Sequence, residues 1–264
     1  MCLIAFAWHA HAEYPLIVAA NRDEFFARPT ASADWWDDRQ RVSGRDLRAG
    51  GTWLGASRNG RFAALTNFRD PASQRIDAPS RGALVGDVLD GERSLVEALE
   101  HVSLEASRYN GFNLLAAQWH RDASCAAAWM LSSRGDRRSQ TIEAGVHALS
   151  NASLDTPWPK VERAKDAMRD AMQGAIDLDD LCAKLFALLA DQEIARDDTL
   201  PRTGVALDVE RALSAAFIRM QDYGTRSSTL YVVDREGNAL FIERRCEPEL
   251  PIEERRFDFR IAVV

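Results

Sequence analysis

Short apolar runs that occur in pairs constrain the fold of this chain more than any other feature of its sequence. Each run has the length of a single β-strand, and polar residues separate it from the next. The runs lie at residues 2–8, 15–20, 51–57, 61–67, 111–119, 126–131, 146–151, 228–234, 239–245 and 256–263. Two of them flank Asn59-Gly60, a dipeptide that favours the tight turn of a β-hairpin. The sequence therefore predicts mainly antiparallel sheets.

Apolar residues recur at helical spacing in the regions between these runs. Residues 82–102 show this spacing with an interruption at Asp90, which predicts two short helices. Further helices are predicted over 157–172, with Thr156 as N-cap, and over 177–189. Strand pairs followed by helices and then by more strand pairs are typical of an α+β fold. We expect one domain over residues 1–264.

Composition excludes several classes of function. The 264 residues carry a formal net charge of -7, which argues against general affinity for nucleic acid or anionic membranes. An apolar run of about 18 residues is absent from the sequence, so we expect no stable membrane insertion. The four cysteines are widely spaced, without a C-x-x-C pair, and read as reduced thiols rather than a metal site. We expect a soluble cytoplasmic protein with no metal and no cofactor.

The second residue, Cys2, combines two kinds of chemistry. Removal of Met1 would give it a free α-amine beside its thiol. A thiol is a strong nucleophile once deprotonated, and an α-amine is suited to accept its proton near neutral pH. The alternative is that Cys2 is a small apolar residue that opens a core strand.

Polar residues follow the second apolar run closely. Asn21, Arg22 and Asp23 end it, and antiparallel pairing would bring that end towards Cys2. A carboxylate can orient the ammonium form of a terminal amine, and an arginine can hold that carboxylate in place. A surface turn with an ordinary Arg-carboxylate pair explains the same residues.

Other polar residues stand at the ends of later runs. Asn67 and Asn151 each close a predicted strand, where their amides can stabilise an oxyanion or simply form a turn. Arg226 precedes a predicted strand and can anchor a carboxylate, or face solvent. Trp53 can line an apolar pocket or pack in the core.

Taken together, these residues resemble those of a known family, the N-R-D-E motif proteins, also called the transport and Golgi organisation family. The resemblance covers essentially the whole chain. Its motifs are Met1-Cys2-Leu3-Ile4, Ala19-Ala20-Asn21-Arg22-Asp23-Glu24-Phe25, Arg28-Pro29, Gly50-Gly51-Thr52-Trp53-Leu54-Gly55, Ala64-Leu65-Thr66-Asn67, Tyr109-Asn110-Gly111-Phe112-Asn113, Leu149-Ser150-Asn151, Thr156-Pro157-Trp158 and Tyr223-Gly224-Thr225-Arg226.

That family is in turn similar to the cysteine N-terminal nucleophile hydrolases, such as choloylglycine hydrolase and penicillin V acylase. The similarity implies a four-layer αββα sandwich. It also implies Cys2 as nucleophile, Asp23 as the carboxylate near the amine, Asn67 and Asn151 as oxyanion or substrate contacts, and Arg226 as a late arginine of the site.

One element departs from the acylase pattern. Those acylases have an arginine three residues before the aspartate, where this chain has Ala20. Arg22 can replace that arginine only from a different backbone position, so the departure argues against bile-salt or penicillin hydrolysis in particular.

The resemblance implies two functions. The first is hydrolysis of a non-peptide amide C–N bond through an acyl-enzyme on Cys2, with Asn21, Arg22 and Trp53 as substrate contacts. The second is a non-catalytic carrier of haem, an acyl lipid or acyl-CoA on the same fold, with a role in haem trafficking. In both cases the expected partner is a small molecule.

Overall fold

The computed structural model describes residues 2–36, 40–90, 93–135, 137–248 and 250–262. The strands are β1 (Cys2–Trp8), β2 (Leu16–Phe25), β3 (Thr30–Trp35), β4 (Arg41–Asp46), β5 (Leu54–Ser57), β6 (Arg61–Asn67), β7 (Phe112–Gln118), β8 (Ala127–Ser132), β9 (Ser139–Thr141), β10 (Gly145–Leu149), β11 (Tyr223–Val233), β12 (Asn238–Arg245) and β13 (Glu253–Arg260). The α-helices are α1 (Gly82–Leu89), α2 (Leu95–Glu105), α3 (Pro159–Gly174), α4 (Leu178–Leu189) and α5 (Leu207–Ala212), and three short 3₁₀ turns lie at Pro71–Ser73, Ala106–Arg108 and Asp197–Thr199.

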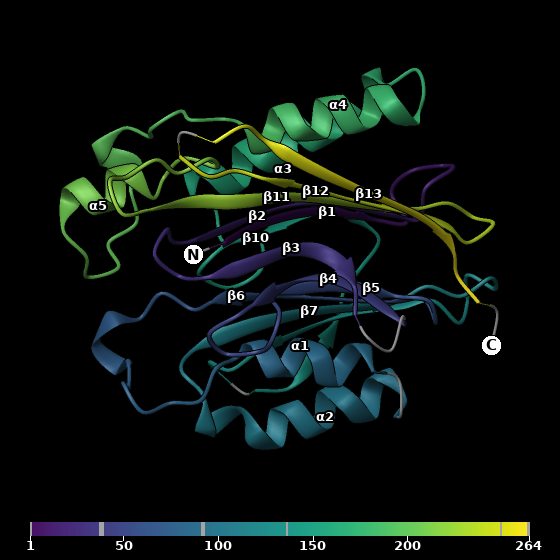
Figure 1. Ribbon diagram of the computed structural model, residues 1–264, viewed down its shortest axis with the longest axis horizontal. Helices are drawn as coiled ribbons and strands as arrows, with labels where there is room; N and C mark the ends of the chain where they lie inside the picture. Colours follow the sequence, from purple (N-terminus) through teal and green to yellow (C-terminus); the bar gives the residue numbers. More distant parts are fainter. Residues whose placement is uncertain (1, 37–39, 91–92, 136, 249, 263–264) are drawn as a thin grey trace.

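The strands form two antiparallel sheets that lie face to face (Figure 1). The first has the order β10-β1-β2-β11-β12-β13, and the second has the order β3-β4-β5-β6-β7-β8-β9. Neighbours along the chain mostly pair as hairpins, as the paired apolar runs predict. The long-range pairings of β10 with β1 and of β11 with β2 bring chain segments far apart in sequence to the two edges of the N-terminal hairpin.

Helices cover the outer face of each sheet. α3 and α4 lie over the first sheet, and α1 and α2 lie over the second, which makes four layers in the order αββα (Figure 1). Three apolar cores separate these layers: one between the sheets, one under α3 and α4, and one under α1 and α2. Alternate residues of β1 pack in two different cores. Ile4 and Phe6 face the other sheet, while Leu3 and Ala5 face the helices.

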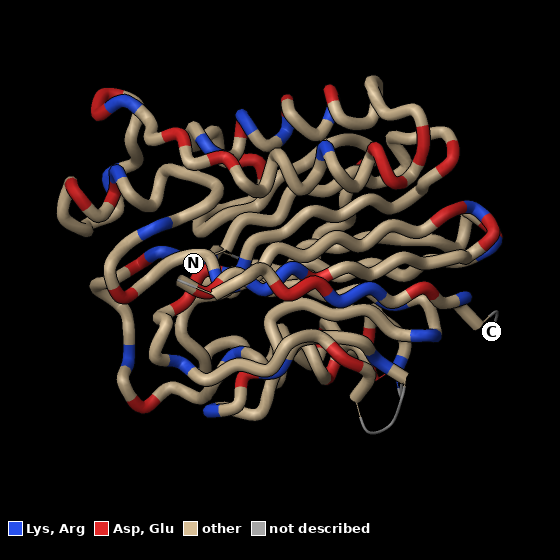
Figure 2. Tube along the Cα trace, turned by 45° about the horizontal axis from the view of Figure 1, so that its top comes forward, with Lys and Arg blue, Asp and Glu red and all other residues tan. Residues whose placement is uncertain are grey.

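Charge follows the same layering. Acidic and basic residues are interspersed along the outer helices and loops, while the inner strands are largely uncharged (Figure 2). None of the helices in the described part of the chain is long and apolar enough to cross a membrane.

The α+β class, the αββα architecture and most of the predicted strands are confirmed. The break near Asp90 separates α1 from α2, and Asp177 caps α4 by accepting a hydrogen bond from the Asp180 backbone. Val263, the predicted end of the last strand, lies outside the described residues.

Several predicted boundaries are wrong. The second strand does not end before Asn21 but continues to Phe25, so the polar cluster lies inside it. The strand predicted from Ser228 begins at Tyr223. β3, β4, β9 and α5 were not predicted at all.

The start predicted for the third helix is also wrong. α3 begins at Pro159, with Trp158 as its N-cap residue. Thr156 does not cap it, because its hydroxyl donates to the Ser153 carbonyl at 2.8 Å and closes a turn. Pro159, two residues after the predicted start, takes the first helical position instead.

Candidate active site

Cys2 opens β1 at one end of the first sheet. It pairs with Arg22 of β2, and because the strands are antiparallel, its backbone nitrogen points along the strand towards Asp23. The residue is only partly exposed. Burial raises the pKa of the Cys2 thiol, and the Asp23 charge raises it further, while a hydrogen bond from the Asp23 backbone and the charge of Arg22 oppose the rise. A thiol in this setting stays protonated at neutral pH until a base takes its proton.

Asp23 is buried two residues beyond Asn21 on β2. The Thr225 hydroxyl donates to its Oδ1 at 2.7 Å and accepts the Ile218 backbone N–H at 2.9 Å, so the direction of the hydrogen bond to the carboxylate is fixed. The Tyr223 hydroxyl donates to the Asp23 carbonyl at 3.0 Å. Burial raises the pKa of the Asp23 carboxyl, and the charge of the chain's terminal amine opposes the rise most strongly, followed by Lys160, Thr225 and Arg22.

A bulge faces this aspartate. Thr225 pairs with Asp23 and Ser227 pairs with Arg22, which leaves Arg226 as an extra residue in β11. The Arg226 guanidinium donates to the carbonyls of Phe25 and Arg28 at 2.8 and 2.9 Å and pairs with Glu247 at 2.8 Å. Arg226 therefore holds the segment that follows β2.

Asn21 and Arg22 lie on opposite faces of β2. The Asn21 amide faces the helices, where it donates to the carbonyls of Leu189 and Ala216, both at 2.8 Å, and its oxygen accepts the Ser228 hydroxyl at 2.6 Å. Both of its side-chain N–H groups are thus used within the fold.

Arg22 faces the space between the sheets. Its guanidinium lies over the Trp53 ring at 4.4 Å from the centroid and bonds the Thr30 hydroxyl at 3.3 Å, with Asp46 3.9 Å away. The Trp53 ring packs so closely on Gly44 that a Cβ at that position would overlap it. Glycine at 44 therefore allows the stacked Arg22–Trp53 pair to form.

The two predicted asparagines come together beside Cys2. The Asn151 amide donates to the Asn67 carbonyl at 2.8 Å, and the neighbouring Ser150 hydroxyl donates to the Cys2 carbonyl at 3.2 Å. Asn151 is fully buried and retains a second amide N–H beyond the one bonded to Asn67. Main-chain and side-chain contacts thus link β1, the end of β6 and the end of β10.

Sequence reasoning did not find four residues of this neighbourhood: Lys160, Arg69, Glu210 and Thr225. Arg69 Nη1 and Glu210 Oε2 form a buried ion pair at 2.7 Å. Lys160 is buried in the first turn of α3, and its charge acts on both Asp23 and Cys2. A signal for Lys160 does exist in the sequence, since it occupies the apolar stripe of its helix with Ala164 and Met168.

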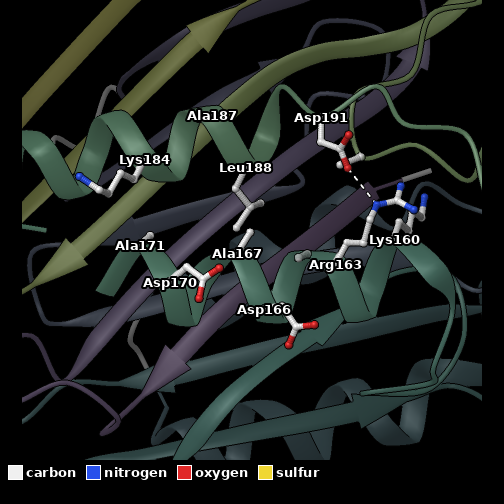
Figure 3. A pocket seen from close by; sticks show the side chains of 12 residues that line it. Lys160, Arg163, Asp166, Ala167, Asp170, Ala171, Lys184, Ala187, Leu188 and Asp191 are labelled. Carbon is white, nitrogen blue, oxygen red and sulfur yellow. Dashed lines mark hydrogen bonds and ion pairs between the residues drawn. The ribbon is translucent and has the colours of Figure 1, made fainter. Parts of the chain in front are cut away.

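The larger cavities lie away from the thiol. A groove of about 600 Å³ runs between α3 and α4 on the outer surface and is lined by alanines and charged residues (Figure 3). A second cavity, of about 510 Å³, is lined by Thr225, Cys246 and apolar side chains that include Phe26, Ile218 and Met220. No group of three or more His, Cys, Asp or Glu side chains that could hold a metal ion occurs among the described residues.

Comparison with known proteins gives a family and a fold. The model of the Transport and Golgi organisation 2 family matches residues 1–248. The Transport and Golgi organization protein 2 homolog of Bos taurus is 38% identical over 257 residues, covering 92% of this chain and 92% of the relative. The Homo sapiens homolog is 37% identical over 262 residues with the same coverage, and the Drosophila melanogaster protein is 29% identical over 260 residues, covering 92% of this chain and 91% of the relative.

Two solved structures that superpose on this chain are hydrolases. A Caenorhabditis elegans ortholog of N-acylethanolamine-hydrolyzing acid amidase superposes with a TM-score of 0.52 at 12% identity, over 88% of this chain and 92% of that one. The C2A mutant of conjugated bile acid hydrolase from Clostridium perfringens superposes with a TM-score of 0.51 at 10% identity, over 98% and 92%. These identities bear on the fold alone. With a family model that matches nearly its whole length, the chain belongs to the Transport and Golgi organisation 2 family and has the fold of the N-terminal nucleophile hydrolases.

Proposed function

We propose that this protein hydrolyses a non-peptide amide C–N bond, with Cys2 as the nucleophile. One observation carries the proposal: the register of β1 against β2 pairs Cys2 with Arg22, so that the nitrogen end of Cys2 lies beside the next residue of β2, the buried Asp23. Once Met1 is removed, that nitrogen is an α-amine with a thiol on the same residue and a carboxylate beside it. This is the set of groups that an N-terminal nucleophile needs.

The reaction follows from the charges of these groups. The neutral α-amine takes the thiol proton, and the thiolate sulfur attacks the amide carbonyl. The C–N bond breaks as the ammonium returns the proton to the leaving nitrogen, which departs as an amine and leaves a thioester on Cys2. Water, deprotonated by the same amine, attacks the thioester, and the carboxylic acid leaves as the thiol regains its proton.

Each of the other residues has a proposed role in this scheme. Asp23 stabilises the ammonium form of the amine. Asn67 and Asn151 donate amide hydrogens to the oxyanion, which is supported by their linkage beside Cys2. Arg226 fixes the segment that borders the site through its contacts with Phe25 and Arg28.

Substrate contacts are proposed for Asn21, Arg22 and Trp53. The stacked Arg22–Trp53 pair offers a cation and an aromatic face to a substrate in the space between the sheets. Asn21 acts less directly, because its amide is bonded to Leu189 and Ala216.

The structural neighbours support amide chemistry. One is named for hydrolysis of N-acylethanolamines and the other for hydrolysis of conjugated bile acids. The second was solved as a C2A mutant, so a cysteine stands at position 2 of that enzyme as well. Ala20, in place of the arginine of the acylase pattern, favours a substrate other than bile salts.

A second candidate function is carriage of an acyl lipid, acyl-CoA or haem without turnover. The observation that favours it is the apolar cavity of about 510 Å³, which does not include Cys2 in its lining and is large enough for a small ligand.

The experiment incubates the purified protein with N-palmitoylethanolamine and with a taurine-conjugated bile acid and measures the released amine. We expect hydrolysis of the first compound, and a loss of about a thousandfold or more in Cys2→Ala. Cys125→Ala, which removes an exposed thiol, is the matched control and should retain full activity. Turnover that survives in Cys2→Ala would contradict the proposal. Unchanged amide that co-elutes with both wild type and Cys2→Ala in gel filtration would support the carrier instead.

A further inference from the structure

Lys160 is a buried cation whose ammonium group has no hydrogen-bond partner among the described residues. It lies in the first turn of α3 with 2% of its surface exposed, on the stripe that also carries Val161, Ala164 and Met168 into the core under the helices. Its Nζ makes no hydrogen bond within the described part of the chain. Lysine on such a stripe normally reaches water with its ammonium group, and this one does not.

An ammonium group in this setting destabilises the fold unless another charge compensates it. The effective penalty for burying a cation is several kcal/mol, and it falls when an opposite charge lies nearby. The chain has lysine at positions 160, 165 and 184 only, and the other two are partly exposed and paired with carboxylates.

The charges that face Lys160 come from four different segments. Asp23 on β2 and Glu210 on α5 attract it, as does Cys2 on β1 once its thiol is deprotonated, and Arg69, in the loop after β6, repels it. Glu210 is bound to Arg69 at 2.7 Å, which makes Asp23 the main compensating charge. Burial lowers the pKa of Lys160 to about 8, and Asp23 opposes that shift.

The geometry keeps Lys160 on the same side of the sheet as Asp23. Asn21, two residues before Asp23, reaches the helix layer through Leu189 and Ala216, so the Asp23 side chain lies on that face too. Figure 3 shows Lys160 beside Arg163, whose guanidinium is bound to Asp191 at 3.0 Å. The charge of Arg163 is therefore compensated by Asp191, while Lys160 has no such carboxylate within hydrogen-bond distance among the described residues.

We propose that Lys160 is a positioning residue of this site, whose buried ammonium group is a counter-charge that favours the ionised form of the Asp23 carboxylate beside the Cys2 nitrogen. The catalytic part of this inference rests on the proposed function, because it acts through the amine that Asp23 stabilises. The inference adds α3 to the elements that form the site, since none of the site residues predicted from the sequence lies on that helix.

The coupling has a definite sign. Loss of the Lys160 charge raises the pKa of Asp23, so that Asp23 binds a proton at higher pH. In return, loss of the Asp23 charge lowers the pKa of Lys160 below its value of about 8. A buried lysine with a purely structural role would not respond to Asp23 in this way.

The test is an NMR titration of protein labelled with ¹³C at lysine Cε, since the sequence limits the spectrum to three signals. The signal that disappears in Lys160→Met should titrate near pH 8 in wild type. In Asp23→Asn its midpoint should fall by about one pH unit, which is a tenfold change in proton affinity. The Lys165 signal is the internal control, because that lysine faces Asp155 and Glu162 at 3.4 Å. An unchanged Lys160 midpoint in Asp23→Asn would overturn the inference.

A second readout covers the case in which Asp23→Asn does not fold. Urea denaturation compares wild type with Lys160→Met between pH 4 and pH 7. Because its Asp23 has the higher pKa, Lys160→Met should lose stability relative to wild type as pH rises through that range. A difference that does not vary with pH would contradict the coupling.

Hydrolysis assays connect the coupling to the reaction. Lys160→Met should move the acid limb of the pH–rate profile to higher pH, and Lys165→Met should leave it in place. If the NMR coupling is found but no amide is hydrolysed, the proposed function fails and the ion pair stands. If amides are hydrolysed but the Lys160 midpoint does not change in Asp23→Asn, the proposed function stands and the ion pair between Lys160 and Asp23 fails.

Discussion

At the scale of the residue, several ionisable side chains of this protein are buried. Cys2, Asp23 and Lys160 gather on and beside the end of β1, and a further carboxylate, Glu243, lies between the two sheets. Glu243 Oε1 accepts the Ala33 backbone N–H at 2.6 Å, so a residue of β12 is tied to a strand of the other sheet. Burial raises the pKa of Glu243 to about 7, against the opposing effects of the Ala33 hydrogen bond and the charge of Arg22.

The raised pKa of Glu243 predicts a dependence of stability on pH. The folded protein retains the Glu243 proton between about pH 4.5 and 7, where the unfolded chain has released it, so stability falls as pH rises through that window. Glu243→Gln preserves the acceptor for Ala33 and removes the charge. We expect the variant to be equal to wild type near pH 4.5 and more stable by roughly 3 kcal/mol above pH 7.

Chemical denaturation at a series of pH values measures this difference. Glu100→Gln, at an exposed position on α2, is the control and should follow wild type throughout. A constant difference between Glu243→Gln and wild type from pH 4.5 to pH 8 would contradict the assignment.

At the scale of elements, the site depends on segments that the long-range pairings bring together. The bulge in β11 turns Arg226 towards the segment after β2, and the Arg69–Glu210 ion pair joins the loop after β6 to α5. Glu210 also accepts the Thr203 backbone N–H at 2.9 Å through its other oxygen. One buried carboxylate therefore fixes α5 and the loop that precedes it.

Loss of that carboxylate should destabilise the protein. Glu210→Gln removes the charge of the buried ion pair between Glu210 and Arg69, and we expect a decrease of about 3 to 5 kcal/mol in the free energy of unfolding. The matched control is Asp197→Asn. It breaks the exposed pair between Asp197 and Arg211, which lies on α5 next to Glu210, and it should leave the unfolding midpoint unchanged. Equal midpoints for Glu210→Gln and Asp197→Asn in urea would show that the buried pair contributes nothing.

At the scale of the whole molecule, the paired apolar runs predict the antiparallel α+β class, and the family resemblance implies the four-layer order. The run at residues 2–8 is apolar throughout, and β1 is in fact covered on both faces. β3 was missed because only Ala33 among its residues is buried, so the strand has no apolar pattern to detect. β9 has three residues at a sheet edge, which is too short for any periodicity.

The site was predictable only in part, because some of its residues are placed by tertiary contacts and not by a local sequence pattern. The motifs point to Cys2, Asp23, Asn67 and Asn151, which belong to segments with clear local patterns. The apolar stripe of α3 indicates that Lys160 is buried, but the effect of Lys160 on Asp23 depends on how α3 packs on the sheet, which no local pattern encodes. The extension of β2 past Asn21 was missed because its polar residues are satisfied by tertiary contacts, such as the bond from Thr225 to Asp23.

The most direct test of Cys2 as an N-terminal nucleophile is the intact mass of the protein, quenched in acid during turnover of N-palmitoylethanolamine, with the adduct mapped by peptide sequencing. We expect a chain that lacks Met1 and carries one acyl group on Cys2, with Cys125, Cys182 and Cys246 unmodified. A chain that retains Met1 and carries no acyl group at Cys2 would contradict the role of Cys2 as nucleophile.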